Sequence, residues 1–264
     1  MSKYIIIILS LLLFTECATV PVTGRKQLNL VSNAEIIPLA DSQYKEVIAQ
    51  GPLSNDAEQV AMVKKVGGKI QLAVEQYMKD NGHATELNDF NWEFNLIVED
   101  VANAWCMPGG KVAFYTGILP ICQDEAGIAV VMGHEVAHAI ANHGRERMSQ
   151  QLAIQMGLSS LEAAMGENPT MTKEIFMQSM GIGSQLGMLK FSRQHESEAD
   201  KIGLIFMAMA GYNPEAAPAF WERMKAMSGG AAPPEWLSTH PSNETRIADL
   251  KAAIPEAMKY YKKP

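Results

Sequence analysis

The feature that most constrains this sequence is an apolar helix that carries ionisable side chains. Asp124 is a good N-cap, and we expect a helix from there to Gln151, with two apolar turns before the run H-E-V-A-H at residues 134–138. Positions four apart on a helix lie about 40° apart around the axis, so both histidines share one face. Burying unpaired ionisable groups costs free energy, whereas a bound metal ion compensates for that cost. The sequence therefore predicts a metal site on this helix.

The H-E-x-x-H spacing favours zinc. The imidazoles of His134 and His138 can hold one zinc ion, and Glu135 between them can reach a water molecule beside the metal. On an unbroken helix, His143 lies about 180° around the axis from His134 and faces away from the metal. The expected ligands on this helix are therefore His134 and His138.

A second helix, opening at Ser192, offers two further carboxylates. Glu196 and Asp200 are four residues apart and share a face. A catalytic zinc site takes three protein ligands, and two histidines with one glutamate form a standard set, so Glu196 is the candidate third ligand. Asp200 can accept the spare ring N–H of a ligand histidine and fix its tautomer. Without the upstream motif, these acids indicate only a helix start favoured by the macrodipole.

A small sheet is expected before the motif helix. Residues 90–98 alternate in polarity, and residues 103–107 and 111–116 flank the turn Pro108-Gly109-Gly110. Helices are expected at residues 32–49, opened by a capping box, and at residues 56–79. The fold class is therefore α+β and mainly helical. An exposed sheet edge can hold a peptide as an added strand.

Length and composition limit the size of the fold and the classes of partner that the chain can bind. The 264 residues, 47% of them hydrophobic, suffice for one sizeable core or at most two small domains. The net charge of −7 argues against a nucleic-acid partner, because phosphate binding needs a concentrated basic face. Cys106 and Cys122 either form a disulfide or are two buried free thiols, and the free thiols are favoured.

The N-terminus is typical of an export signal. Lys3 precedes an apolar run of about ten residues, too short to span a bilayer. The run ends at Cys17, which resembles the lipid-modified cysteine of bacterial lipoproteins, and Ala18 follows it rather than aspartate. We therefore expect a signal peptide at 1–17, a tether at 18–33, a domain at 34–264, and a periplasmic protein anchored to the outer membrane by lipid. A plain secreted protein or an uncleaved anchor are the alternatives.

Four sequence blocks resemble one family. The H-E-x-x-H motif, followed by E-x-x-A-D at residues 196–200, is similar to the zinc metallopeptidases of the HtpX and CaaX-prenyl-protease family. Residues 103–111 resemble the family's edge strand and hairpin, and residues 240–247 its C-terminal element. The blocks follow the family's order, and the start of the chain is similar to the periplasmic lipoprotein members.

The resemblance implies a zincin-like metalloendopeptidase with one Zn²⁺ per chain. It assigns His134, His138 and Glu196 as ligands, and Glu135 as the general base. It implies that Asp200 orients a ligand and that substrate pairs with the strand at Asn103, Ala104 and Trp105. Arg246 is expected to anchor its helix by an ion pair rather than to touch substrate.

The role of His240 stays open at this point. Near the metal it can stabilise the oxyanion of the tetrahedral intermediate, or act as a fourth ligand that holds the enzyme inactive. The implied substrates are unfolded or misassembled envelope proteins. The alternative is a chaperone-like assembly factor, with outer-membrane assembly partners and a latent zinc site closed by His240.

Overall fold

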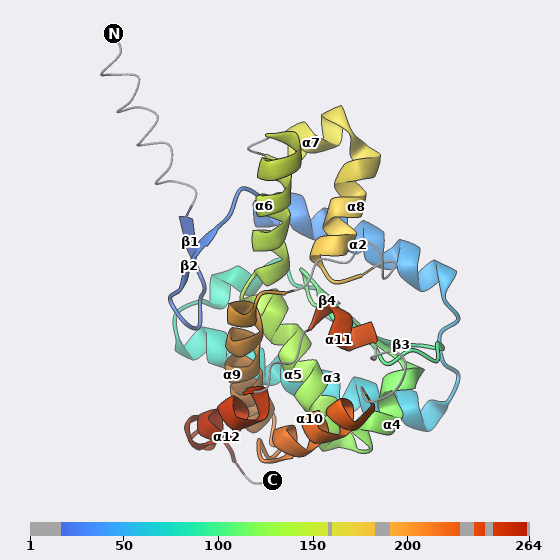
Figure 1. The fold of residues 1–264 in the computed structure, drawn as a ribbon, viewed down its shortest axis with the longest axis vertical. Helices are drawn as coiled ribbons and strands as arrows, with labels where there is room; N and C mark the ends of the chain where they lie inside the picture. Colours follow the sequence, from blue (N-terminus) through green and yellow to red (C-terminus); the bar gives the residue numbers. More distant parts are fainter. Residues whose placement is uncertain (1–16, 158–159, 183–190, 228–234, 241–244, 263–264) are drawn as a thin grey trace.

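The computed structural model describes residues 17–157, 160–182, 191–227, 235–240 and 245–262. Within these ranges the chain is mainly helical with two small sheets (Figure 1), which confirms the expected fold class. The strands are β1 (Cys17–Thr19), β2 (Lys26–Leu28), β3 (Glu93–Ile97), β4 (Ala104–Met107) and β5 (Lys111–Tyr115). The helices are α2 (Asn33–Gln50), α3 (Ala57–Asp80), α4 (Leu119–Cys122), α5 (Glu125–Ile140), α6 (His143–Met156), α7 (Leu161–Glu167), α8 (Pro169–Ser179), α9 (Arg193–Met209), α10 (Ala216–Met227), α11 (Glu235–Thr239) and α12 (Arg246–Ala257).

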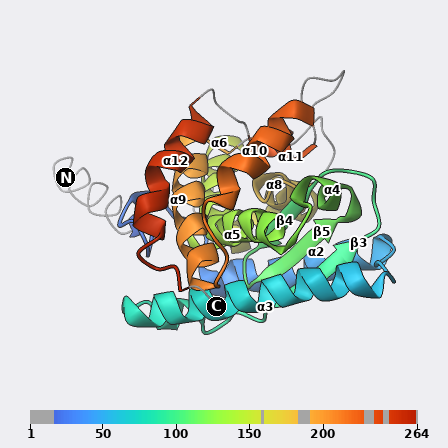
Figure 2. The same cartoon turned by 90° about the horizontal axis from the view of Figure 1, so that it is seen from below.

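The first two long helices begin where their caps predict. The Ser32 side chain accepts from the backbone of Glu35, and the Glu35 carboxylate accepts from the backbone of Ser32, which completes the capping box of α2. Asp56 caps α3 by accepting from the backbone N–H groups of Glu58 and Gln59. Helix α3 then runs beneath β3 and α5 (Figure 2), and Gly67 lets it approach the Phe94 ring closely.

The three-stranded sheet has the order β3-β5-β4, with β3 parallel and β4 antiparallel to β5. Gly109 and Gly110 have φ values of 83° and 79°, a left-handed conformation that glycine adopts easily, and they form the expected hairpin turn. Strand β4 lies at the edge of this sheet. All four of its residues are buried and α5 packs against the strand, so this edge is not exposed as expected.

The sheet separates two clusters of buried hydrophobic residues. Alternate residues of β5 point to opposite sides, with Val112 and Phe114 in one cluster and Ala113 in the other. The first cluster is built on α3, α5, α9 and α10, and the second on α2, α6, α7 and α8. Val20 and Val31, in the segment expected to be a tether, are buried in the first and second cluster respectively. Cys106 and Cys122 are both buried and free.

The motif helix is shorter than expected. Helix α5 ends at Ile140, Asn142 has a φ of 58°, and α6 starts at His143. Asparagine tolerates the left-handed region better than other non-glycine residues, so it permits this sharp break. The expectation of one continuous helix to Gln151 is therefore wrong. Because α6 leaves in a new direction (Figure 1), the side chain of His143 does not face away from the motif.

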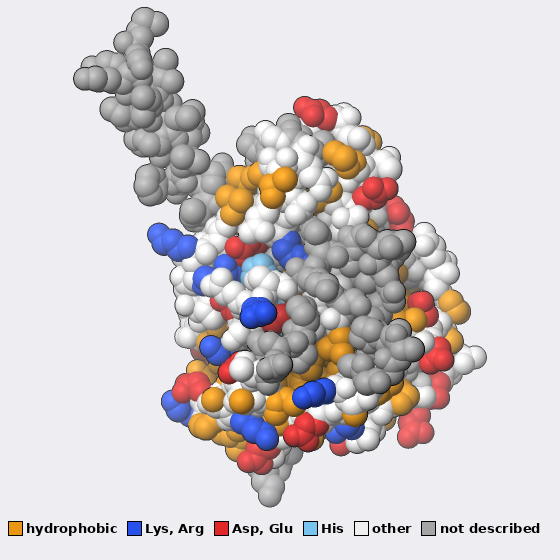
Figure 3. All heavy atoms as spheres, viewed as in Figure 1, with side chains coloured by type: hydrophobic (Ala, Val, Ile, Leu, Met, Phe, Trp, Pro, Cys, Tyr) orange, Lys and Arg blue, Asp and Glu red, His pale blue; other side chains and the backbone are white. Residues whose placement is uncertain are grey.

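The surface carries interspersed charges. On the face drawn in Figure 3, Lys and Arg side chains alternate with Asp and Glu, and hydrophobic side chains show over α6 and α7. Ile154 of α6 is 76% exposed. Among the described residues, no helix combines the length and apolar character needed to cross a bilayer.

Two facing glycines set the distance between α5 and α9. A Cβ built on Gly133 lies 2.8 Å from the backbone oxygen of Gly203, and a Cβ built on Gly203 lies 2.9 Å from the Gly133 backbone. The two helices therefore touch backbone to backbone. This contact brings the side chains of His134 and Glu196, one on each helix, to the same place.

Replacing Gly203 with alanine is expected to lower the free energy of unfolding by about 1–3 kcal/mol, because the added methyl group overpacks this contact. Urea denaturation followed by circular dichroism measures the change. Gly68→Ala is the control, since a Cβ there meets no atom within 4 Å. In the interior of α3 it is expected to stabilise by about 0.5–1 kcal/mol. Equal effects of both substitutions would contradict the packing argument.

Candidate metal centre

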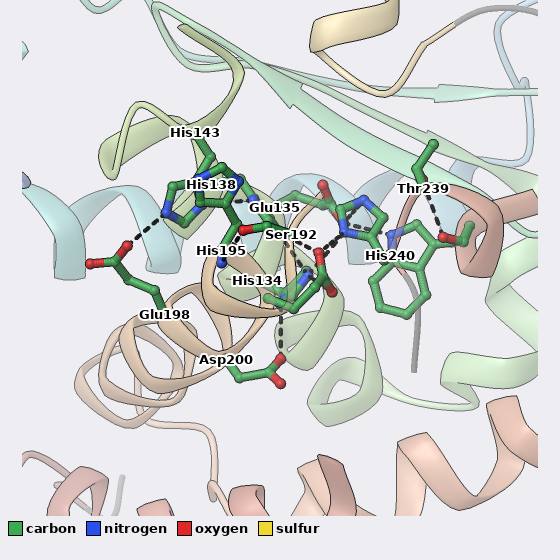
Figure 4. A network of polar contacts seen from close by, with 12 residues as sticks. His134, Glu135, His138, His143, Ser192, His195, Glu198, Asp200, Thr239 and His240 are labelled. Atoms are coloured by element: carbon green, nitrogen blue, oxygen red, sulfur yellow. Dashed lines mark hydrogen bonds and ion pairs between the residues drawn. The ribbon is translucent and has the colours of Figure 1, made fainter. Parts of the chain in front are cut away.

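Four buried side chains converge at the centre of the molecule. His134 and His138 come from α5, Glu196 from α9, and His240 follows the end of α11 (Figure 4). One ligand atom from each residue lies within 4.8 Å of all the others. Their exposed fractions are 4% or less. The structure therefore brings together the residues that the sequence singled out as ligands, and places His240 among them.

The distances between these atoms fit a small cation. His134 Nε2 lies 3.1 Å from His138 Nε2 and 3.2 Å from His240 Nδ1. Glu196 Oε1 lies 3.3 Å from His138 Nε2 and 3.0 Å from His240 Nδ1. Ligand atoms at about 2.1 Å from a tetrahedral zinc ion lie about 3.3–3.4 Å from one another. Nitrogen and carboxylate oxygen donors are those that zinc takes, so the donor set fits the metal.

Electrostatics also suit a cation here. Burial lowers the pKa of His138 well below its usual range and keeps the ring neutral, the form that binds metals. Burial alone raises the pKa of Glu196, but His240 and Arg246 lower it well below its usual range. Burial also opposes the charge on His134, yet Asp200 and Glu196 raise its pKa to about 9. Metal binding to His134 therefore releases a proton.

Glu135 lies beside the four donors. Its side chain is 3% exposed, and burial raises the pKa of its carboxyl group. Its Oε1 accepts a hydrogen bond of 2.6 Å from the indole nitrogen of Trp236 and lies 3.5 Å from His240 Nε2. Trp236 was not among the residues expected at the site. It is fully buried in α11 and stacks on Trp221, 5.0 Å between ring centroids.

Asp200 and Arg246 hold the outer side of the ligands. Asp200 Oδ1 lies 3.0 Å from His134 Nδ1, the ring nitrogen opposite the converging atoms. Arg246 donates to Glu196 Oε2 and to Asp200 Oδ1, at 2.7 Å each. Arg246 makes the ion pair expected of it, and its guanidinium also lies 3.4 Å from the Trp221 ring centroid. One arginine thus holds the carboxylates of Glu196 and Asp200 in place.

His143 lies at the site, although the sequence predicted that it faces away from the metal. Its Nδ1 lies 2.9 Å from His138 Nδ1, and its Nε2 lies 3.0 Å from Glu198 Oε2 (Figure 4). The break at Asn142 causes this, because on a continuous helix the same ring faces away. An asparagine directly before the histidine was the one local signal of a break.

A pocket beside the donors touches the sheet edge. Glu135, His138 and Phe191 line it together with Cys106 and Pro108 of the β4–β5 hairpin. The residues expected to hold substrate lie next to this point. Ala104 is buried, Asn103 Oδ1 accepts from the backbone of Ala104, and the Trp105 indole donates to Tyr115. The Trp105 ring also packs edge-on against Tyr44, so its side chain belongs to the core.

Comparison with known families agrees with this geometry. The model of peptidase family M48 matches residues 66–254, which include all four converging residues and Glu135. This chain belongs to peptidase family M48. It is therefore a metalloendopeptidase, as the motif and the resemblance predicted.

Several M48 relatives are similar along most of the chain. The mitochondrial metalloendopeptidase OMA1 of Schizosaccharomyces pombe is 33% identical over 245 residues, covering 92% of this chain and 68% of the relative. OMA1 of Saccharomyces cerevisiae is 32% identical, covering 96% and 73%. The beta-barrel assembly-enhancing protease of Escherichia coli is 28% identical over 88% of this chain, which spans 46% of that protein.

These relatives correct the predicted location. The two OMA1 proteins are named as mitochondrial, which contradicts the expected periplasmic lipoprotein held at the outer membrane. The expectation rested on Lys3, a short apolar run and Cys17. Such a run is a feature of composition that many N-terminal segments share, so it specifies a compartment weakly. Residues 1–16 lie outside the described part of the chain.

Proposed function

We propose that this M48 member is a zinc-dependent endopeptidase with one Zn²⁺ per chain, held by His134, His138 and Glu196. The observation that carries the proposal is the convergence of buried nitrogen and oxygen donors within 4.8 Å of one another, directly beside Glu135. A bound zinc ion supplies Lewis acidity, which activates water and polarises a peptide carbonyl group.

Glu135 is the proposed general base. Its carboxylate takes a proton from the attacking water and passes it to the leaving amine. The raised pKa of the buried carboxyl group suits this role, because the proton must be both accepted and released near neutral pH. Asp200 accepts a hydrogen bond from the Nδ1–H group of His134, which keeps the proton on Nδ1 and leaves the lone pair of Nε2 for the metal.

The substrate is proposed to bind as an extended strand along β4, at Asn103, Ala104 and Trp105, after the closed state described below opens and uncovers this buried edge. Two observations support this: β4 is the edge strand of its sheet, and the neighbouring pocket has Glu135 in its wall. Only a segment without fixed tertiary structure can add to an edge in this way. We therefore propose unfolded or misassembled proteins as substrates, in a quality-control role, in keeping with the assembly-related name of the E. coli relative.

Casein digestion tests this proposal. We expect the purified protein to cleave casein internally, to lose this activity completely in EDTA, and to regain it with one equivalent of Zn²⁺ but not with Mg²⁺, which prefers oxygen ligands. A tightly folded globular protein serves as the control substrate and should resist cleavage. Full activity in EDTA, or restoration by Mg²⁺ alone, would contradict a zinc mechanism.

A latent form is the second candidate, because α11 covers the site. His240 Nδ1 lies among the donor atoms, 3.0 Å from Glu196 Oε1, where a fourth ligand would replace the reacting water. On α11 itself, the Trp236 indole donates a hydrogen bond to Oε1 of Glu135. The position of His240 opposes the binding of the reacting water, and the hydrogen bond from Trp236 opposes proton uptake by Glu135. They support a closed state, which also fits a chaperone-like factor whose peptidase is rarely active.

His240→Ala is therefore expected to raise the rate of casein cleavage by about tenfold. This value holds if the closed form makes up about nine-tenths of the wild-type protein, because only about one-tenth is then active. Zinc affinity is expected to fall at the same time, because one nitrogen donor is lost. The control is His83→Ala, which changes a histidine in the loop before the short 3-10 helix at 84–87. A lower rate would assign His240 to oxyanion stabilisation, and an unchanged rate and affinity would exclude it from the site.

A further inference from the structure

The two nitrogens of the His138 ring face different partners. Nε2 points to the other donors, 3.1 Å from His134 Nε2, while Nδ1 lies 2.9 Å from His143 Nδ1. His143 is completely buried, and its second nitrogen lies 3.0 Å from Glu198 Oε2. Figure 4 shows these groups in a row that leads away from the donor cluster.

This row determines the ring tautomers. A carboxylate only accepts hydrogen bonds, so the proton between His143 and Glu198 belongs to His143 Nε2. His143 Nδ1 is then the acceptor, and the proton between the two rings belongs to His138 Nδ1. His138 Nε2 keeps its lone pair, which is the arrangement that a metal ligand needs.

Glu198 is itself held by the N-terminal hairpin, residues 17–28, which contains β1 and β2. Arg25 Nε donates to Glu198 Oε2 at 2.6 Å, and the Thr23 hydroxyl donates to Oε1. The same guanidinium donates to Glu146 Oε2 at 2.8 Å, and Glu146 in turn contacts His195 at 3.1 Å. Arg25 therefore compensates two buried carboxylates at once.

The backbone of the hairpin around Arg25 is fixed by hydrogen bonds and by one buried side chain. Backbone hydrogen bonds of 2.8 Å join Val20 to Arg25 and Gly24 to Val20, and Gly24 takes the left-handed conformation that the turn requires. The Val20 side chain is 1% exposed and anchors the turn in the main hydrophobic cluster. Arg25 thus reaches the core from a fixed backbone.

We infer that the N-terminal hairpin is a working part of the metal centre, and that Arg25, Glu198 and His143 are positioning residues that fix the ring of His138. The inference rests on the proposed metal site. The proposed arrangement around His138 matches the other half of that site, where Arg246 and Asp200 fix the ring of His134. One arginine from each of two segments far apart in the sequence supports one ligand histidine, so both segments must be packed before the site is complete.

Zinc affinity of the full-length metal-free protein tests the inference, measured by competition with a chromophoric chelator. His143→Leu is expected to weaken zinc binding by about 10–100-fold, the usual effect of losing an outer hydrogen-bond partner of a ligand. His143→Asn should recover part of the loss, because its amide oxygen can accept from His138 Nδ1. Arg25→Met is expected to weaken binding by about tenfold, since Glu198 loses its main partner.

Thermal unfolding separates positioning from plain stability. The increase in Tm on adding a fixed excess of Zn²⁺ is expected to shrink for His143→Leu and Arg25→Met. The matched control is Arg223→Met, which removes a guanidinium that binds the backbone of Ile121 and Cys122. It should lower the Tm of the metal-free protein and leave the zinc-induced increase unchanged.

The possible outcomes are distinct. If wild-type protein binds zinc and the Arg25 and His143 variants bind it equally well, the inference is overturned while the proposed function stands. If wild-type protein itself does not bind zinc, the proposed metal site fails first. If Arg25→Met does not fold, His143→Asn compared with His143→Leu still decides the question.

Discussion

Glu135→Gln is expected to reduce the kcat/KM for casein by about 10²–10⁴-fold, the usual contribution of a general acid–base residue, while zinc content stays at one ion per chain. Glutamine has almost the shape of glutamate but cannot take up the proton. Its amide oxygen can still accept from the Trp236 indole, so the packing of α11 is preserved. Because the side chain is not among the converging donors, His134 and His138 keep their positions.

Metal analysis and the digestion assay, run on the same preparation, check both halves of this prediction. Glu58→Gln is the control, since this exposed glutamate lies in the first turn of α3. A Glu135→Gln protein that keeps zinc and full activity would remove Glu135 from the mechanism. One that loses zinc would give Glu135 a structural role. Unchanged function in the cell with no peptidase activity would favour the chaperone-like factor.

Glu196→Gln is expected to cause a comparable loss of activity by a different route. The neutral amide is a far weaker zinc ligand than the carboxylate, and the substitution also removes one of the two charge partners of the buried Arg246. Zinc affinity is expected to fall by more than the roughly 10–100-fold typical of outer-shell residues. Activity should therefore be lost at limiting zinc and return in part at high zinc.

Chelator competition measures the affinity, and activity titrated with Zn²⁺ shows the partial return. Glu135→Gln is the informative comparison, because its activity should not return at any zinc concentration. The Glu58→Gln control should bind zinc as the wild type does. If Glu196→Gln bound zinc with unchanged affinity, the third ligand would have to be another residue, and His240 is a further nitrogen donor among the described residues of the site.

Local patterns in the sequence predicted much of this structure. The capping box at Ser32, the cap at Asp56 and the hairpin at Gly109 depend on residues a few positions apart, and all three are present. The spacing of His134 and His138, and of Glu196 and Asp200, places each pair on one face of its helix for the same local reason. These short-range patterns, with the family resemblance, sufficed to select the residues of the candidate centre.

Those local patterns could not predict the contacts between residues far apart in the sequence. The Trp236 indole meets Glu135 from 101 positions away, and Arg25 meets Glu198 across 173 positions. Neither pair has a spacing that any periodicity reveals, because packing of separate elements brings the partners together. His143 was misplaced for a smaller reason: the backbone conformation of Asn142 alone redirects the next helix.

The sequence by itself determined which side chains can bind a metal and accept a proton, because ligand type and helical spacing are local properties. Only the tertiary structure decided how those side chains are held. The close contact of Gly133 with Gly203 sets the distance between the two ligand helices, and Arg25 and Arg246, far apart in the sequence, hold the carboxylates of Glu198 and Asp200. Both depend on which distant surfaces fit together, a property of the packed chain and of no single segment.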